Sequence, residues 1–311
     1  MFKKKKRVVV TGGGERYRVE EEVMKGGYSV VFAATRVSDG ARVAVKEIGG
    51  VSGDDEGEGY GDGPSSPVEI ELQALRSLGG VEGVVDVLDS DAEAGVLVFP
   101  FFPTGMAEYV EGHASGETAS LPPVLRTRLT PRMLVEIFAG VARGLEAMEE
   151  AGYAHRDVKP SNIMFEIEGG AISPVLIDLG SVRPALITIG DRGEALAEQD
   201  IAAAHTTGQF RAPELFDVET GAEITAKTDV WGLGASLWSA AFLELAFEAG
   251  SYTAAVANLS PPPIVSGESV ADTGDVSYRD VYDLCTWMCQ VDVAARPRAS
   301  EVVQRMESLL V

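Results

Sequence analysis

The sequence HRDVKPSN at residues 155–162, followed by LIDLG at residues 176–180, provides the strongest indication of the fold. The first segment places a carboxylate, Asp157, two residues before the amine of Lys159 and five before the amide of Asn162. Asn162 and Asp178 carry hard oxygen ligands of the kind that Mg²⁺ prefers in proteins. A polar turn after an amphipathic helix, with a buried aspartate in a later turn, is the alternative, and it accounts poorly for both segments in this order.

The two segments resemble the catalytic loop, H-R-D-x-K-x-x-N, and the metal-binding turn, D-x-G, of protein kinases. Phosphoryl transfer depends on positioning and charge neutralisation more than on covalent chemistry. The resemblance implies that Asp157 accepts a hydrogen bond from the attacking hydroxyl group and aims it at the γ-phosphate of ATP, while Lys159 offsets the charge that develops there. Asn162 and Asp178 are then expected to hold Mg²⁺, with Mn²⁺ as an alternative ion.

Composition limits the other possibilities. With 311 residues, 45% hydrophobic and 24% charged, the chain can bury a large core in one or two domains. It contains no apolar run as long as a membrane span and no apolar secretory segment at its start. The net charge of -22 argues against general nucleic-acid binding and favours basic protein substrates. Cys285 and Cys289 are expected to be a reduced, buried pair in a cytosolic protein.

Residues 1–15 are expected to form a flexible, basic and glycine-rich arm. The cluster Lys3–Arg7 could contact an anionic membrane weakly, act as a nuclear signal or remain a solvated tail, and the tail is the default. Residue 2 is phenylalanine, not the glycine that N-myristoylation requires, and no cysteine lies nearby for palmitoylation. The arm is therefore expected to carry neither lipid.

Residues 17–48 alternate in polarity and are rich in valine, as expected of three short strands. Glycines at residues 26 and 27 separate the first two strands, and RVAVK at residues 42–46 supplies the pattern V-A-x-K. By resemblance, the glycine loop covers the phosphates of ATP and Lys46 grips the α- and β-phosphates. Met24 takes the place of the first loop glycine, where its side chain could crowd the nucleotide. The nucleotide contacts expected here are Val23, Gly26, Gly27, Tyr28, Ser29, Val31, Ala44 and Lys46.

The acidic run at residues 49–67 has little to bury and is expected to be a disordered insert. A helix from about Val68 to Leu78 follows, and it carries two candidate partners for Lys46. Glu71 is favoured because the leucines of this helix share its side, whereas Glu69 is the competing candidate.

Two further strands are expected at residues 84–87 and 96–99, followed by a hinge at residues 100–105. The resemblance implies that adenine binds the Pro100 carbonyl and the Phe102 amide, with Phe99 at the back of the pocket. Met164 is expected to complete this site. Apolar residues in these strands could equally belong to an ordinary core.

Helices are expected from about residue 130 to 148, within 194–204, and at 278–291 and 300–310. RAPE at residues 211–214 matches the kinase A-P-E motif, and the resemblance implies a buried ion pair between Glu214 and Arg296. Asp229 is expected to accept hydrogen bonds from the backbone near His155.

The segment between these motifs ends in two threonines. By resemblance, Thr207 is expected to bond to Asp157 and Lys159. Thr206 is a candidate phosphorylation site or a plain polar loop residue, and Arg156 and Arg183 could bind such a phosphate.

Together, these residues resemble the eukaryotic protein kinase superfamily from about Tyr17 to Leu310. Lys159 in its motif is typical of serine/threonine kinases. A closer resemblance, to the Numb-associated kinase family, rests on GGYS at 26–29, PFF at 100–102, RGLEAM at 143–148, GYAHRD at 152–157, DLGS at 178–181 and RAPELF at 211–216. Members of that family carry a helix late in the activation segment, which fits the alanine-rich run ending at Ala204.

The resemblance implies an α+β, bilobal fold with a five-stranded antiparallel sheet and one helix in the N-lobe and a mainly helical C-lobe. The kinase domain would span residues 16–311, with the N-lobe at 16–99, the hinge at 100–105 and the C-lobe at 106–311. Its implied activity is ATP-dependent phosphorylation of serine and threonine in protein substrates. A monomer is expected, located in the cytoplasm and peripherally at Golgi or other membranes, with a role in trafficking. A catalytically weak nucleotide-binding scaffold is the alternative, which Met24 alone favours.

Overall fold

The computed structural model describes residues 7–26, 29–49, 66–247 and 275–311. The expected loop residues Gly27 and Tyr28, the basic residues Lys3–Lys6 and nearly all of the acidic insert lie outside these ranges. The chain divides into two compact units, Met1–Val81 with Val85–Pro103, and Glu82–Val84 with Thr104–Val311. No helix within the described ranges is both long and apolar enough to cross a membrane.

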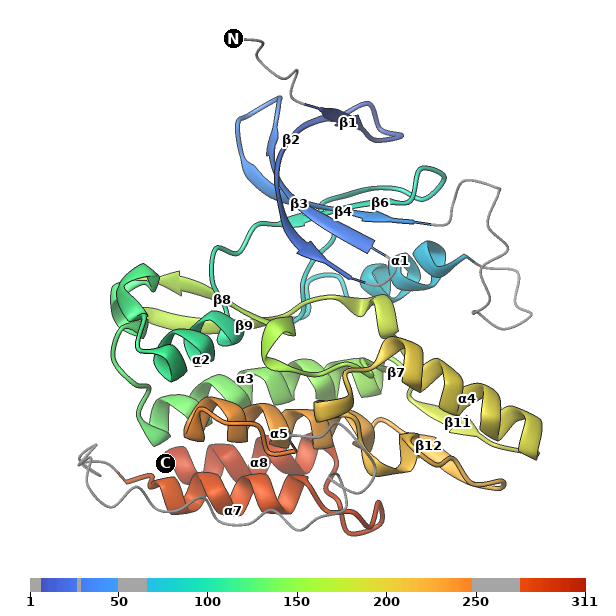
Figure 1. Ribbon diagram of the computed structural model, residues 1–311, viewed down its shortest axis with the longest axis vertical. Coiled ribbons are helices and arrows are strands. Elements are labelled where there is room, and N and C mark those ends of the chain that lie inside the picture. Colours follow the sequence, from blue (N-terminus) through green and yellow to red (C-terminus); the bar gives the residue numbers. More distant parts are fainter. Residues whose placement is uncertain (1–6, 27–28, 50–65, 248–274) are drawn as a thin grey trace. The chain divides into compact units, whose positions relative to one another are not determined.

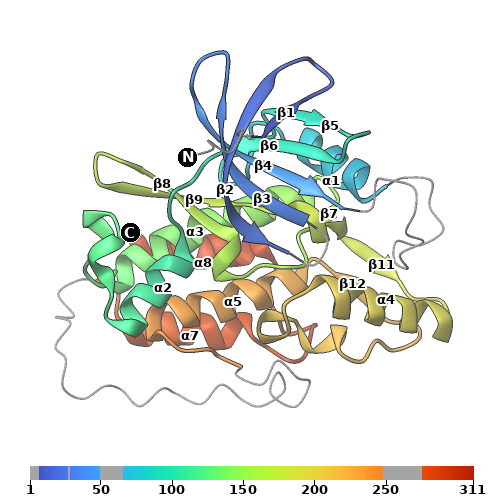
Figure 2. The ribbon, with the colours of Figure 1, turned by 45° about the horizontal axis from the view of Figure 1, so that its top comes forward.

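The first unit is built on a six-stranded antiparallel sheet with the order β1-β2-β3-β4-β6-β5; Figure 1 labels all of these strands except β5, which Figure 2 labels. Its strands are β1 Val8–Val10, β2 Arg16–Lys25, β3 Ser29–Arg36, β4 Arg42–Ile48, β5 Asp89–Asp91 and β6 Val96–Pro100. β-Branched side chains suit such a pleated, half-buried surface. One face of the sheet carries the core cluster of Tyr17, Ala34, Val43, Val45, Val96 and Val98.

The prediction of a flexible arm at residues 1–15 is wrong for the part that the structure describes. Strand β1 pairs with β2, and its Val9 packs against the sheet core. Thr11 Oγ1 and the Tyr17 hydroxyl group both donate to Asp89 Oδ2, at 2.6 and 2.9 Å. Burial and this aspartate raise the pKa of Tyr17 well above its ordinary value. The sheet therefore has six strands, not the expected five.

The strand expected at residues 84–87 is also misplaced, because the strand that pairs with β6 is the polar β5. Val84 instead forms an isolated bridge with Leu176 in the second unit. The position of β5 is set by its backbone pairing with β6. The residues of β5 are Asp89, Ser90 and Asp91, which are all polar, so an apolar pattern cannot reveal this strand. Helix α1, Pro67–Ser77, follows the prediction closely.

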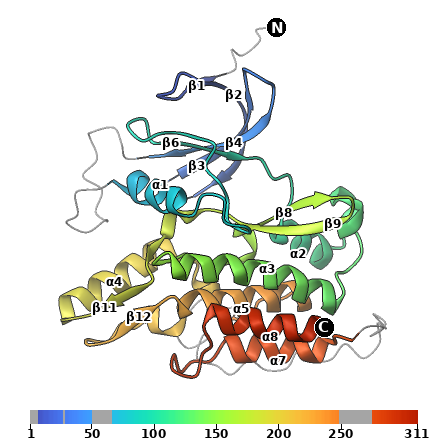
Figure 3. The same cartoon turned by 180° about the vertical axis from the view of Figure 1, so that it is seen from behind.

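The second unit is mainly helical. Its helices are α2 Met106–Ser115, α3 Pro131–Glu150, α4 Arg192–His205, α5 Lys227–Phe242, α7 Tyr278–Met288 and α8 Ala299–Leu310. Helices α3, α5, α7 and α8 pack against one another (Figure 3). Thr130 caps α3 by accepting the Met133 N–H at 3.3 Å, and Pro131 opens its first turn, which agrees with the helix predicted from about residue 130. Helix α5 is buried along almost its whole length and forms the centre of this unit.

Among the described residues, the second unit also contains three two-stranded antiparallel sheets (Figure 2). They pair β7 Tyr153–Ala154 with β10 Arg183–Pro184, β8 Ile163–Glu168 with β9 Ala171–Leu176, and β11 Leu186–Thr188 with β12 Glu223–Thr225. The pair β11–β12 lies beside α4, where Ile224 and Ala195 share one apolar cluster. The catalytic-loop motif thus runs from β7 to β8, and the D-x-G turn runs from β9 to β10.

Candidate active site

The loop between β7 and β8 brings three predicted residues together. Lys159 Nζ lies 2.6 Å from Asp157 Oδ2, and Asn162 Nδ2 donates to the Asp157 carbonyl oxygen at 2.8 Å. Asp157 is 8% exposed, so its carboxylate is held by neighbours while a small part of the residue stays accessible. An oriented acceptor beside a cation is the arrangement that a group aiming a hydroxyl nucleophile needs.

Asp229, in the first turn of α5, binds the backbone of the catalytic loop. Its two carboxylate oxygens accept the backbone N–H groups of His155 and Arg156, each at 2.7 Å, which confirms the predicted contact. Burial raises the pKa of Asp229 above its ordinary value, while His155, Arg156 and the two N–H groups act against this shift. The carboxylate therefore serves as a fixed, fully buried anchor for the loop.

Arg156 has a left-handed backbone conformation, with φ at 69°. A residue with a side chain pays on the order of 1–3 kcal/mol for such a conformation, and surrounding contacts must hold it there. Asp229 supplies one contact, and the guanidinium group donates to Thr228 Oγ1 and to the Pro184 carbonyl oxygen, both at 3.1 Å. The strain lies directly before Asp157, where it sets the direction of the next side chain.

His155 links the catalytic loop to the D-x-G turn. Its Nδ1 accepts the Asp157 N–H at 3.3 Å, so the proton is assigned to Nε2, which lies 3.0 Å from the Ile177 carbonyl oxygen. The Ile177 N–H in turn donates to the Asn162 carbonyl oxygen at 2.9 Å. Asp178 follows at once, with a second left-handed φ of 64°.

The residues present fit a magnesium site of the kind that binds together with a phosphate substrate. Because the Asn162 amide nitrogen donates to Asp157, its side-chain oxygen is directed away from that bond. This oxygen and the Asp178 carboxylate are hard ligands, and Mg²⁺ typically takes one or two protein ligands and completes its shell with phosphate and water. Within the described ranges, no group of three or more His, Cys, Asp or Glu side chains is arranged to hold a metal ion.

Thr207 joins the two charged groups of the loop, as predicted. Its backbone N–H donates to Asp157 Oδ1 at 2.9 Å, and its Oγ1 accepts from Lys159 Nζ at 2.7 Å. Asp157 Oδ2 contacts Lys159, so each oxygen of the carboxylate has its own partner. The segment after α4 therefore takes part in fixing the catalytic loop.

The arginine that contacts Thr206 is Arg211, not Arg156 or Arg183. Arg211 Nε donates to Thr206 Oγ1 at 2.6 Å, and its Nη2 donates to the Thr206 carbonyl oxygen at 3.0 Å. Arg183 is paired with Glu198 at 2.7 Å instead. Arg211 belongs to the RAPE motif, and only the return of the chain after residue 207 brings it beside Thr206.

In the first unit, Lys46 and Glu71 form the predicted ion pair. Lys46 Nζ lies 2.7 and 2.9 Å from the two Glu71 oxygens, and the two side chains are only 6% and 2% exposed. The competing candidate, Glu69, has a different role, because it forms a capping box with Ser66 at the start of α1. Helical phasing thus identified the correct glutamate.

Strand register places several expected nucleotide contacts on one face of the sheet, opposite the core cluster. Val31 lies opposite Lys46, and Ala44 lies opposite Phe99, and cross-strand partners share a face. A register shift in β2 brings Met24 opposite Val31. Val23 lies in the part of β2 where the register shifts, and the Gly26 N–H donates to the Ser29 carbonyl oxygen. Pro100 is the last residue of β6, and Phe102 lies two residues after it.

Gly105, which the sequence did not single out, permits a close approach next to Met164 in the second unit. A Cβ atom at this position would lie 2.5 Å from the Ile163 carbonyl oxygen and 2.7 Å from Met164 Sδ. Gly105 and Met164 also form an isolated backbone bridge. A glycine is therefore required where the chain enters α2.

Glu214 and Arg296 form the predicted clamp of the helical unit. Two guanidinium nitrogens lie 2.7 and 2.9 Å from the two carboxylate oxygens. Arg296 also donates to the carbonyl oxygens of Gln290 and Lys227 and lies over the Trp231 ring, 5.1 Å from its centre. A buried charge with this many partners fixes the RAPE segment to α5.

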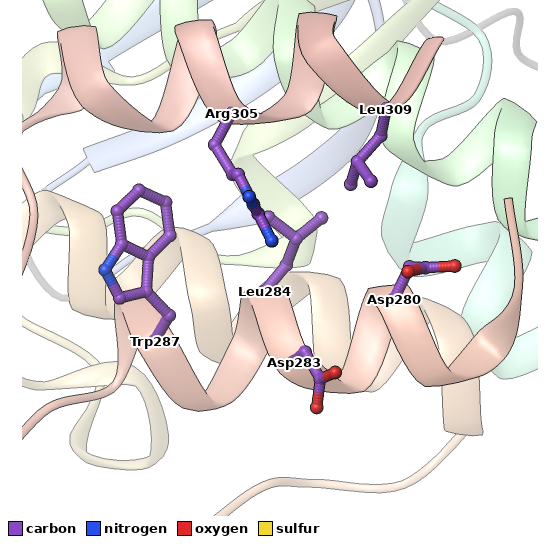
Figure 4. A pocket seen from close by; sticks show the side chains of 6 residues that line it. All are labelled: Asp280, Asp283, Leu284, Trp287, Arg305 and Leu309. Carbon is purple, nitrogen blue, oxygen red and sulfur yellow. The ribbon is translucent and has the colours of Figure 1, made fainter.

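A cavity of about 290 Å³ lies between α7 and α8, away from these motifs. Figure 4 shows Arg305 and Leu309 reaching from α8 toward Leu284 on α7. Trp287, Asp280 and Asp283 complete its lining. None of the predicted site residues belongs to this cavity.

A curled antiparallel sheet with a Lys–Glu ion pair, and a helical unit with this catalytic loop, together define a protein kinase domain. The model of the protein kinase domain matches residues 17–306, and the chain belongs to this family. Serine/threonine-protein kinase 16 of Mus musculus is 31% identical over 301 residues, which cover 95% of this chain and 90% of the relative.

The kinase of the same name from Homo sapiens is 38% identical over 186 residues, 58% of this chain and 57% of the relative. Serine/threonine-protein kinase ppk13 of Schizosaccharomyces pombe is 28% identical over 282 residues, 80% of each chain. The protein is accordingly a serine/threonine protein kinase. Its family generally uses ATP and Mg²⁺ and acts on protein substrates.

Proposed function

We propose that Asp157 orients the serine or threonine hydroxyl group of a protein substrate toward the γ-phosphate of ATP and accepts its proton. The observation that carries this role is the pairing of each Asp157 oxygen with a separate group, Lys159 at 2.6 Å and the Thr207 N–H at 2.9 Å. A carboxylate held on both oxygens keeps one orientation, and orientation is the main contribution of protein groups to phosphoryl transfer. Lys159 offsets the negative charge that develops on the transferred group.

Lys46 is proposed to bind the α- and β-phosphates of ATP, with Glu71 holding the ammonium group in place. Asn162 and Asp178 are the proposed protein ligands of Mg²⁺, which when bound neutralises the phosphate charge. The proposed adenine contacts are backbone groups of Pro100 and Phe102. The apolar surroundings are proposed to come from Val23, Val31, Ala44, Phe99 and Met164, and the loop from Gly26, Gly27, Tyr28 and Ser29.

The test compares the parent protein with Asp157→Ala in the presence of Mg·ATP and a basic protein substrate, with modified residues mapped by mass spectrometry. We expect phosphate on serine and threonine, and a fall in turnover of several orders of magnitude in the variant, with nucleotide affinity nearly unchanged. Turnover retained in Asp157→Ala contradicts the role given to this residue. No transfer by the parent itself favours a nucleotide-binding scaffold, with Met24 as the first residue to revert to glycine.

A second variant, Asp178→Asn, tests the metal assignment separately. Its affinity for ATP is expected to fall when Mg²⁺ is present and to stay unchanged in the presence of a chelator. An equal affinity of parent and variant for Mg·ATP contradicts the assignment of Asp178.

We further propose that the protein belongs to the Numb-associated kinase family and resembles its small myristoylated and palmitoylated member. The motifs in the glycine loop, hinge and RAPELF segment support this closer relationship. The proposal includes a cytoplasmic monomer that acts in membrane trafficking, peripherally at Golgi or other membranes, with a weak electrostatic contact through Lys3–Arg7. Flotation with vesicles that contain or lack an anionic lipid tests the contact, and equal recovery from both kinds of vesicle counts against it.

A further inference from the structure

Helix α4 carries a buried carboxylate in the middle of its apolar side. Its buried residues are Ala195, Glu198 and Ala202, which follow one another at helical spacing along one stripe. Ala195 and Ala202 pack into an apolar cluster with Leu215 and other residues. Glu198 is 5% exposed, although a charged side chain is rarely buried unless it is paired. A specific partner must therefore hold it.

The partner of Glu198 is Arg183, which lies next to the catalytic loop in space. Arg183 Nη2 lies 2.7 Å from Glu198 Oε2, and the side chains are 24% and 6% exposed. Arg183 belongs to β10, where it lies opposite Ala154, the residue directly before His155. The ion pair thus ties the middle of α4 to the strand from which the catalytic loop begins.

A second arginine, Arg156, lies near this ion pair. Arg156 is 6% exposed and donates to the carbonyl oxygen of Pro184, the neighbour of Arg183. Burial lowers the pKa of Arg156, Arg183 acts in the same direction, and Asp229 and Glu198 oppose it. Without Glu198, two neighbouring guanidinium groups would remain with less negative charge to balance them.

The C-terminal end of α4 continues directly into the catalytic contacts. The His205 carbonyl oxygen accepts a hydrogen bond from Ser181 Oγ at 2.6 Å, and Thr207 then contacts Asp157 and Lys159. The position of α4 therefore sets the position of the Thr207 N–H. A shift of the helix would therefore move the Thr207 N–H away from the Asp157 carboxylate.

A phosphate on Thr206 could not easily replace this arrangement. The Thr206 hydroxyl group donates to the Ala202 carbonyl oxygen at 2.8 Å, so it lies at the C-terminal end of α4. Negative charge is unfavourable at that end of a helix dipole. A phosphate there would meet Arg211, whose Nε lies 2.6 Å from Thr206 Oγ1, whereas Arg183 is already paired with Glu198. The negative charge that balances Arg156 and Arg183 is instead built into the chain.

We propose that Glu198 is a positioning residue whose carboxylate takes the place of an activating phosphate. It binds Arg183, balances Arg156 and holds α4 so that Thr207 meets Asp157 and Lys159. Catalysis then requires no phosphorylation of the segment between Asp178 and Glu214. This inference rests on the proposed role of Asp157, but it makes its own prediction about the order of α4 and Thr207.

The experiment uses the full chain after treatment with a phosphatase, with the absence of phosphate verified by mass spectrometry. Two single variants, Glu198→Gln and Arg183→Met, break the ion pair, and the double variant Glu198→Leu/Arg183→Met replaces both charges with apolar groups. Such a paired replacement is often neutral for folding, whereas removing one member of a buried pair is costly. Asp200→Asn is the matched control, because Asp200 is an exposed carboxylate on the same helix.

The dephosphorylated parent is expected to be active. Each single variant should lose about tenfold or more in kcat while KM for ATP stays within about twofold, and the double variant should recover most of the loss. Hydrogen exchange of the Thr207 amide should accelerate in the single variants and return toward the parent value in the double variant. Asp200→Asn should match the parent in both measurements.

If the proposed function holds, either of two results overturns the inference. One is a dephosphorylated parent that gains activity only when Thr206 is phosphorylated. The other is a pair of single variants with parental turnover and parental exchange at Thr207. Failure of the proposed function can be told apart from failure of this inference. If phosphoryl transfer by the parent does not depend on Asp157, hydrogen exchange of the Thr207 amide still measures the effect of Glu198. Unchanged exchange in that case also overturns the inference.

Discussion

Glu71 and Glu69 lie on the same helix, but Glu71 is buried and Glu69 is exposed, and their carboxylates bind different groups. The Glu71 carboxylate pairs with Lys46 in a site where both side chains are almost fully buried. We expect Glu71→Gln to lower kcat/KM for ATP by about two to four orders of magnitude, since losing one partner of a buried ion pair costs about 3–5 kcal/mol. Steady-state kinetics with ATP as the varied substrate measures this effect.

Glu69→Gln is the matched control, with the same chemical change two residues away. Its carboxylate accepts the Ser66 N–H at 2.8 Å as part of the capping box, and glutamine can still serve there. We expect kcat/KM within about twofold of the parent and a loss of stability below about 1 kcal/mol. Equal losses in the two variants would contradict the separate roles.

At the scale of single residues, the contacts that the kinase resemblance implies were predicted correctly, and two contacts made by α4 and the segment after it were not. The partners of Asp229 and Thr207 were predicted correctly because the resemblance to protein kinases implies them. Glu198 beside Arg183 was missed because that pair depends on how α4 packs. Arg211 beside Thr206 was missed because the short 3-10 turn Gly208–Phe210 brings the two together. The sequence did offer one sign of a buried, paired Glu198: it is an acidic residue between Ala195 and Ala202 on the apolar side of a helix.

Helix α5 lies against the catalytic loop because it carries a glycine where the two approach. A Cβ atom on Gly232 would lie 2.7 Å from the Val158 carbonyl oxygen and 3.1 Å from Val158 Cβ. Gly232→Ala should therefore push the loop away, lower kcat severalfold and reduce the free energy of unfolding by about 1–3 kcal/mol, as other overpacked sites do. Urea denaturation and turnover measured on the same preparation test both effects.

Gly112→Ala on α2 separates this clash from the general effect of alanine in a helix. The new Cβ atom would lie 3.1 Å from Leu121 Cδ1, the end of a flexible side chain that can move. We expect unchanged turnover and a gain in stability of up to about 1 kcal/mol from the better helix propensity. If Gly232→Ala also leaves turnover unchanged and increases stability, the close approach of α5 to the catalytic loop does not require glycine at residue 232.

Cys285 lies on α7 and Cys289 directly follows its last residue; both are buried, and both thiols are free. Burial raises the pKa of Cys289 to about 12 and that of Cys285 well above its ordinary value. Because the thiolate is the reactive form, both should stay protonated and unreactive at neutral pH. A colorimetric thiol reagent should modify neither cysteine in the native protein within minutes and both after unfolding in urea, and rapid native modification would contradict their burial.

Among the elements, helices were predicted best and edge strands worst, for a physical reason. An apolar stripe at helical spacing is a property of the segment itself, as in α3 and α8. Strands β1 and β5 each contain three residues and exist because a neighbouring strand offers hydrogen-bonding groups. Thr11, Tyr17 and Asp89 join these edges through hydrogen bonds between residues far apart in sequence, which no local pattern reveals.

For the whole molecule, the order of motifs along the chain was enough to predict an α+β kinase fold, because each motif fixes the element that carries it. Composition decides a different property. With 48 acidic against 26 basic residues, the protein has a net charge of -22 and attracts cations over distances longer than a contact. The excess of acidic residues does not determine the fold, but it favours the binding of positively charged substrates.

The charge excess predicts that peptide substrates rich in lysine and arginine bind in a salt-dependent way. Ionic strength shortens the range of electrostatic attraction, from about 14 Å near 50 mM salt to about 6 Å near 300 mM. We expect KM for a basic serine peptide to rise by about fivefold or more across this range, while kcat stays constant. A peptide of equal length with the basic residues replaced by glutamine is the control, and its KM should change by less than about twofold. Parallel changes for both peptides would mean that salt acts on the enzyme itself and that its negative charge does not select basic substrates.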